Sequence, residues 1–291
     1  MNNKLKGYLA GICAAVAYGT NPLGALFLYK EGFNPASVIF YRFTFAVILL
    51  FLILKIKKVP LRINSTELKV LLALGITFAA SALSLYTSFN YLDSGIASTV
   101  LFAYPIMVAV IMAVFFKERV NIFIVLSIIL SAIGILMLYN IDTNAKLSIL
   151  GISLVLISSL TYAVYIVIVN RSKINITPFK MTFYIMSFAA VCTFLYSFSS
   201  KENNIILIPN MTSMLWILFA SIVPTIIAMT LLNIGIFYAG STPTAIMGAL
   251  EPVTAVIISI TIFDGVFTLR LASGILLILI SVLIIIIPKK R

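Results

Sequence analysis

Ten long apolar segments fill almost the whole of this sequence, and they constrain the fold more than any other feature. Their approximate cores are residues 5–29, 35–55, 68–91, 94–116, 121–140, 148–170, 178–198, 212–237, 243–263 and 268–288. A membrane-spanning helix needs about 20 apolar residues. Because 62% of the 291 residues are hydrophobic and 10% are charged, a soluble fold has too little interior to hold them. The sequence predicts an all-α integral membrane protein with ten transmembrane helices and the lipid bilayer as its surroundings.

The basic residues fall unevenly on the two sides of these predicted spans. If the N-terminus is cytoplasmic, 15 of the 20 Lys and Arg residues lie on the cytoplasmic side, four lie outside and Arg42 lies within a span. Cytoplasmic loops of membrane proteins are enriched in Lys and Arg. We therefore expect both termini in the cytoplasm and the protein in the plasma membrane. The net charge of +12 is explained in this way, without a nucleic-acid partner.

The two halves of the sequence match each other at offsets of 143 to 147 residues. The matched residues include Gly7 with Gly151, Tyr18 with Tyr162, Tyr91 with Tyr238, and Pro105 with Pro252. Chance matching of apolar helices is the alternative, but tyrosines and prolines in register favour a duplication. Each half, residues 5–140 and 148–288, holds five predicted helices. Because five is odd, the second half must insert in the opposite orientation, and such inverted repeats place substrate near the membrane centre between them.

Two charged side chains lie away from the ends of the predicted spans, Arg42 and Glu251. A charge at the centre of a transmembrane helix costs roughly 2.5–3.5 kcal/mol on insertion scales and indicates function. The long side chain of Arg42 can reach the membrane surface, so anchoring or structural pairing and a role in the transport pathway are both open. Glu251 is short and central, at the same depth as Tyr104. We expect it to bind substrate or a proton, with a structural hydrogen bond as the alternative.

Polar residues that share helix faces complete the predicted site, since small-molecule sites combine apolar walls with a few polar groups. The candidate substrate-binding residues are Glu251, Tyr104, Tyr18, Asn21, Tyr86, Asn90, Tyr162, Tyr165 and Asn233. Hydrogen bonding between spans is the alternative interpretation for each pair. Pro105 and Pro252 are candidates for gating or kinks, because each leaves a carbonyl, of Leu101 or Gly248, without its helical partner. Neighbouring groups can also satisfy such carbonyls.

Motifs in both halves resemble those of the EamA type of the drug/metabolite transporter (DMT) superfamily. The first half carries ASTVLFAYP at residues 97–105 and FKER at 116–119, and the second carries GALEPV at 248–253 and a last helix around Gly274. The resemblance covers nearly the whole chain and implies a ten-helix permease with a central cavity, often an exporter of amino acids or other small metabolites. The family usually has a glutamate 13 residues after the proline. Glu118 fits, whereas the second half has Gly265 there, preceded by Asp264.

We therefore expect a secondary transporter that exports a small metabolite, such as an amino acid or amine. It would work by alternating access, and proton coupling is left open. A sequence without histidine excludes an imidazole acid or metal ligand. It also lacks paired membrane carboxylates and a P-loop, so we expect no enzyme, cofactor or metal. A channel or facilitator for small polar solutes is the main alternative, ahead of an intramembrane enzyme. The small-molecule substrate is the expected partner, and a homodimer is left open.

Overall fold

The computed structural model describes residues 3–92, 97, 100–118, 120–138, 148–172, 174–262 and 268–286, and their regular structure is helical throughout. The helices are α1 (Asn3–Gly19), α2 (Asn21–Lys30), α3 (Pro35–Ile56), α4 (Ser65–Ser88), α6 (Tyr104–Phe116), α7 (Ile122–Leu138), α8 (Ile149–Arg171), α9 (Pro178–Ser197), η1 (Lys201–Asn203), α10 (Met211–Ser221), η2 (Ile222–Ile227), α11 (Ala228–Ala239), α12 (Ser241–Met247), α13 (Leu250–Ile262) and α14 (Leu269–Ile286). The 3-10 helix η1 and the π-helix η2 are the irregular members of this set. Ser98, Thr99 and Arg119 of the family motifs, and Asp264 and Gly265, lie outside the described residues.

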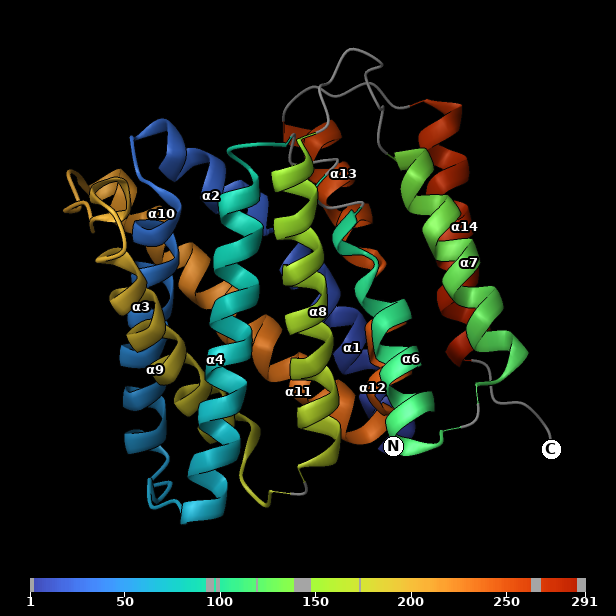
Figure 1. The fold of residues 1–291 in the computed structure, drawn as a ribbon, viewed down its shortest axis with the longest axis horizontal. Coiled ribbons are helices and arrows are strands. Elements are labelled where there is room, and N and C mark those ends of the chain that lie inside the picture. The colour runs from blue at the N-terminus through green and yellow to red at the C-terminus, as the bar shows by residue number, and fades with distance from the viewer. Residues whose placement is uncertain are drawn as a thin grey trace.

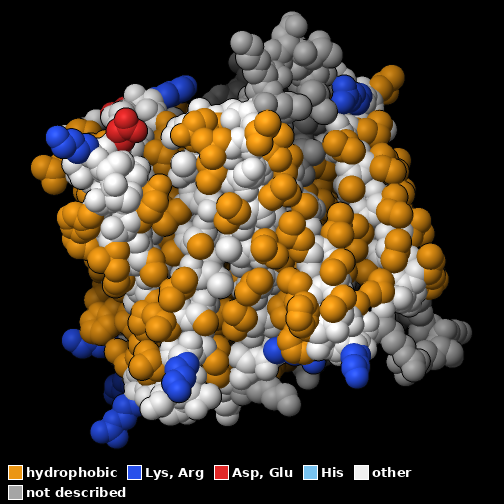
Figure 2. All heavy atoms as spheres, in the orientation of Figure 1, with side chains coloured by type: hydrophobic (Ala, Val, Ile, Leu, Met, Phe, Trp, Pro, Cys, Tyr) orange, Lys and Arg blue, Asp and Glu red, His pale blue; other side chains and the backbone are white. Residues whose placement is uncertain are grey.

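The helices form one bundle (Figure 1) around a core of buried apolar side chains. Seven helical stretches among the described residues are long and apolar enough to cross a membrane, and α6, α7 and α14 are shorter apolar helices. Figure 2 shows apolar side chains over the middle of one face, with Lys and Arg side chains along its lower and upper edges. This distribution suits a protein whose sides face lipid.

Four of the ten predicted spans are interrupted rather than continuous. The first is divided into α1 and α2, the eighth contains the π-helix η2, and the ninth breaks between α12 and α13. In the fourth, a turn at residues 102–103 precedes α6. Each interruption lies at or beside an internal proline, Pro22, Pro224, Pro252 and Pro105 respectively, and a proline removes one backbone donor from the helix. The breaks therefore occur at prolines where the sequence predicts kinks.

Contacts between helices of the two halves occur in equivalent pairs, in which the first and second halves exchange roles. Helix α1 packs on α11 and α13, and its counterpart α8 packs on α4 and α6, while α3 packs on α9 and α7 on α14. A Cβ atom on Gly7 would lie 2.8 Å from Cβ of Tyr238, and one on Gly151 would lie 3.0 Å from Cβ of Tyr91. Both glycines thus permit the same close approach. In Figure 1, α1 begins at the lower edge and α8 at the upper edge, so these two helices run in opposite directions.

Candidate substrate site

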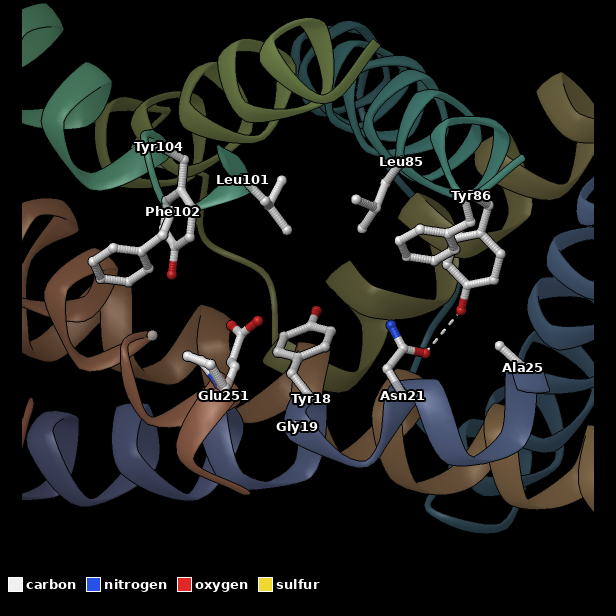
Figure 3. Close-up of a pocket in the computed structure, with 13 residues that line it drawn as sticks. Tyr18, Gly19, Asn21, Ala25, Leu85, Tyr86, Leu101, Phe102, Tyr104 and Glu251 are labelled. Atoms are coloured by element: carbon white, nitrogen blue, oxygen red, sulfur yellow. Dashed lines mark hydrogen bonds between the residues drawn. The ribbon is translucent and has the colours of Figure 1, made fainter. Parts of the chain in front are cut away.

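A cavity lies where α1, α2 and α4 of the first half meet the starts of α6 and α13 (Figure 3). It contains about 640 Å³ of empty space, including solvent at its mouth. Its walls are largely apolar and aromatic, and both halves of the chain contribute to them. The lining residues are Tyr18, Gly19, Asn21, Ala25, Leu85, Tyr86, Phe89, Leu101, Phe102, Tyr104, Gly248, Glu251 and Pro252.

The cavity brings together six of the eleven residues predicted for the site. These six are Tyr18, Asn21, Tyr86, Tyr104, Glu251 and Pro252. Tyr162, Tyr165 and Asn233 are buried behind it, with 8%, 0% and 3% of their surface exposed. Pro105 is buried in the first turn of α6 and does not line the cavity. Asn90 is exposed because α4 ends at Ser88, so the helical spacing that put it on one face with Tyr86 does not extend to it.

Glu251 is the acidic residue of the cavity. It lies in the first turn of α13, where the helix N-terminus favours a negative charge. Its carboxylate forms no hydrogen bond or ion pair with any other described residue, and Figure 3 shows it directed into the cavity. No cluster of three potential metal ligands from His, Cys, Asp and Glu occurs in the described part of the chain. The carboxylate is therefore available to a ligand that enters the cavity.

The proline-freed carbonyls of the two helix breaks both have partners inside the protein. The backbone N–H of Glu251 donates to the Gly248 carbonyl at 2.9 Å. The Ser159 hydroxyl, on α8, lies 2.9 Å from the Leu101 carbonyl and also 2.9 Å from that of Val155. In this conformation, groups of the protein therefore satisfy both carbonyls, and neither carbonyl is left open to a substrate.

Tyr104 lies across the cavity from Glu251, and its position depends on a glycine. The Tyr104 hydroxyl donates to the carbonyl of Ala245 at 3.1 Å. A Cβ atom on Gly248 would overlap that hydroxyl, so a larger residue would displace Tyr104. The Tyr162 ring packs edge-on against the Tyr104 ring at a centroid distance of 4.9 Å. Tyr162 thus supports the cavity wall from behind.

Arg42, on α3, is 3% exposed and lies directly behind the cavity. Its Nε donates to the Thr225 hydroxyl at 2.5 Å, and one Nη donates to the Pro224 carbonyl at 3.0 Å, both in η2. Its other Nη donates to the Asn21 side-chain oxygen at 2.7 Å and to the Tyr86 hydroxyl at 2.9 Å. The side chain therefore does not extend to the membrane surface. The sequence indicated Arg42 only as a charge within a span, because its partners come from distant segments.

A hydrogen-bonded asparagine–tyrosine pair occurs at equivalent positions of the two halves. Tyr86 donates to Asn21 at 2.9 Å, and Tyr165 donates to Asn233 at 2.5 Å. Asn21 and Tyr165 are 144 residues apart, and Tyr86 and Asn233 are 147 apart, so the two residue types have exchanged places. The first pair lines the cavity, whereas the second is buried. The cavity thus occupies one of two equivalent places in the fold.

Comparison with known proteins identifies the class of protein. The EamA-like transporter family matches residues 5–140 and 149–287. Uncharacterized transporter YyaM of Bacillus subtilis is 28% identical over 258 residues, which cover 85% of this chain and 83% of that protein. An uncharacterized transporter of Archaeoglobus fulgidus is 24% identical over 278 residues, which cover 96% and 95%. One solved crystal structure superposes with a TM-score of 0.81 over 97% of this chain and 96% of that chain, at 15% identity, which supports the fold alone.

This chain belongs to the EamA-like transporter family, with two EamA units. It is an integral membrane transporter and not an enzyme. The family resemblance found in its motifs is confirmed.

Proposed function

We propose that this protein is a secondary transporter that exports a small metabolite with an amino group, an amino acid or an amine, across the plasma membrane. The observation that carries the proposal is the Glu251 carboxylate, which has no partner among the described residues and faces the cavity between the two halves. A charge removed from water without a partner is costly. The carboxylate therefore favours an ammonium group in the substrate-bound carrier and a proton in the empty one, which would couple transport to protons.

The walls around Glu251 suit an ammonium group on an apolar or aromatic body. Tyr18, Phe102 and Tyr104 line the cavity beside Glu251, and aromatic rings attract cations through their faces. A polyanion such as a sugar phosphate would instead call for several lysines or arginines on the wall, and the cavity lining contains none among the described residues.

The duplicated packing supports alternating access. The residues equivalent to Asn21, Tyr86 and Phe89 are Tyr165, Asn233 and Ile236, all of which are buried. If the two halves exchange conformations, the second set becomes the open one and the first set closes, as in other inverted-repeat transporters. The basic-residue distribution supports cytoplasmic termini, which would place the lower edge of Figure 1 in the cytoplasm.

The distinguishing experiment is counterflow in liposomes containing the purified protein. If the protein is a carrier, liposomes preloaded with an unlabelled substrate should accumulate the labelled substrate transiently and saturably. The protein should carry no ohmic current. The first screen should compare amino acids and amines at two pH values. Uptake that does not saturate and shows no counterflow, or current that rises linearly with voltage, would identify a channel or facilitator and overturn the carrier proposal.

A further inference from the structure

The side-chain amide of Asn21 has a fixed orientation at one end of the cavity. Arg42 donates to Asn21 Oδ1 at 2.7 Å and to the Tyr86 hydroxyl at 2.9 Å, and Tyr86 donates to the same Oδ1 at 2.9 Å. A guanidinium has donors only, so the amide atom that faces Arg42 must be the oxygen. The nitrogen Nδ2 therefore turns away from Arg42. Figure 3 shows it directed into the cavity, and it donates to no other described residue.

The same end of the cavity is electrically positive. Arg42 is always charged, its four hydrogen bonds go to uncharged acceptors, and no described carboxylate lies within 4 Å of it. A buried charge without a counter-ion is unfavourable, and its field is weakly screened in a low-dielectric interior. An N–H donor backed by a cation is what an anionic group prefers. This end of the cavity is therefore suited to a carboxylate.

The second half of the chain indicates that the arginine is not needed to hold an asparagine–tyrosine pair. There the pair Tyr165–Asn233 forms at 2.5 Å, and Nδ2 of Asn233 lies 3.5 Å from the Thr182 hydroxyl instead of facing the cavity. The residue equivalent to Arg42, 143 positions later, is Ile185. The charge has thus been placed at the one pair that lines the cavity.

The two ends of the cavity consequently carry opposite polarity. Glu251, Tyr18 and Asn21 follow one another along one wall, with the unpartnered carboxylate at one end and the amide nitrogen at the other (Figure 3). We propose that Asn21, oriented by Arg42 and Tyr86, binds the carboxylate of a substrate whose ammonium group contacts Glu251. The substrate is then a zwitterion, and Arg42 is a positioning residue. This inference rests on the proposed function and adds to it a binding site for the carboxylate of the substrate.

The sharpest variant is Asn21→Asp, tested in the full-length protein in liposomes. An aspartate keeps an oxygen for Arg42 and Tyr86 but replaces the cavity-facing donor with an acceptor that repels a carboxylate. The probes are amino acids paired with the amines that lack only the carboxylate, such as leucine with 3-methylbutylamine and phenylalanine with 2-phenylethylamine. The wild type should prefer the amino acid of each pair. Asn21→Asp should weaken amino-acid counterflow about tenfold to a hundredfold relative to amine counterflow, so that the preference for the amino acid of each pair is lost or reversed.

Melting temperature separates this effect from misfolding. Asn21→Asp gives the buried arginine a counter-ion, so its melting temperature should equal or exceed that of the wild type. Asn64→Asp is the matched control, because Asn64 caps α4 at an exposed position far from the cavity and aspartate caps a helix equally well. Asn21→Ala, which removes the donor without adding charge, should shift the preference in the same direction by a smaller factor.

The outcomes distinguish this inference from the proposed function. If the wild type moves amines as well as amino acids, or if both Asn21 variants weaken the two probe classes equally, the carboxylate subsite is refuted and the amine transporter stands. If no member of any pair moves in the wild type, the proposed function is refuted, and the subsite with it.

Discussion

At the scale of single residues, the two charged side chains that lie away from the ends of the spans differ in their hydrogen bonding. Arg42 satisfies four acceptors from α2, α4 and η2 and is buried. Glu251 has no partner among the described residues and faces an open cavity. The cost of a membrane charge makes both stand out in the sequence. Their partners cannot be predicted in the same way, because Arg42 and Thr225 are 183 residues apart and meet only after the helices pack.

The planar guanidinium of Arg42 predicts that lysine cannot replace it. Lysine keeps the charge but directs its three donors from a single nitrogen, so it cannot reach all four acceptors at once. We expect Arg42→Lys to lower the stability in detergent by about 1–3 kcal/mol. Thermal unfolding followed by size-exclusion chromatography measures this. Arg62→Lys, at an exposed position, is the control, and an unchanged midpoint for Arg42→Lys would show that these hydrogen bonds contribute little.

At the scale of helices, internal prolines mark where the spans are interrupted. Each of Pro22, Pro105, Pro224 and Pro252 lies at or beside a break or an irregular turn, so the positions of the breaks are predictable from the sequence. The effect of these breaks on the site residues is not predictable in the same way. Tyr104 and Glu251 lie at helix starts rather than midway along continuous helices, because the chain resumes its helix just beyond each turn.

Ser159 provides a test of how the break before α6 is stabilised. Its hydroxyl approaches the Leu101 carbonyl that Pro105 leaves free. Ser159→Ala should therefore destabilise the protein by about 1 kcal/mol, near the average for hydrogen bonds between membrane helices. Adding Pro105→Ala restores a backbone donor for the same carbonyl and should recover part of the loss. Simple additivity of the two changes in unfolding free energy would contradict this account.

At the scale of the whole molecule, ten apolar segments and a duplicated pattern were sufficient to predict the helical membrane fold and the pairing of the halves. The same sequence does not tell which of the two equivalent places holds the cavity. Asn21 and Tyr165 both lie in apolar helices with a tyrosine or asparagine partner. Which pair is open depends on the conformational state that the halves adopt, and the residue types alone do not determine that.

Exchange of the halves predicts opposite changes in accessibility at Phe89 and its equivalent Ile236. Phe89 lines the cavity, and Ile236 has 0% exposed surface. With Cys13 and Cys192 replaced by alanine, a cysteine at each position should react with an impermeant thiol reagent from opposite sides of the membrane. Saturating substrate on one side should raise one labelling rate and lower the other. Changes in the same sense at both positions would rule out exchange of the halves.

Counterflow by Glu251→Gln tests the central claim, that the cavity carboxylate receives the cationic group of the substrate. Glutamine keeps the shape and removes the charge. We predict that amine and amino-acid counterflow falls at least about tenfold in a variant that remains folded, while Glu67→Gln, in the exposed capping box of α4, transports normally. Loss of pH-driven accumulation with counterflow intact would make Glu251 a proton carrier only. Full gradient-driven transport by Glu251→Gln would contradict the account and leave Glu251 as a structural residue.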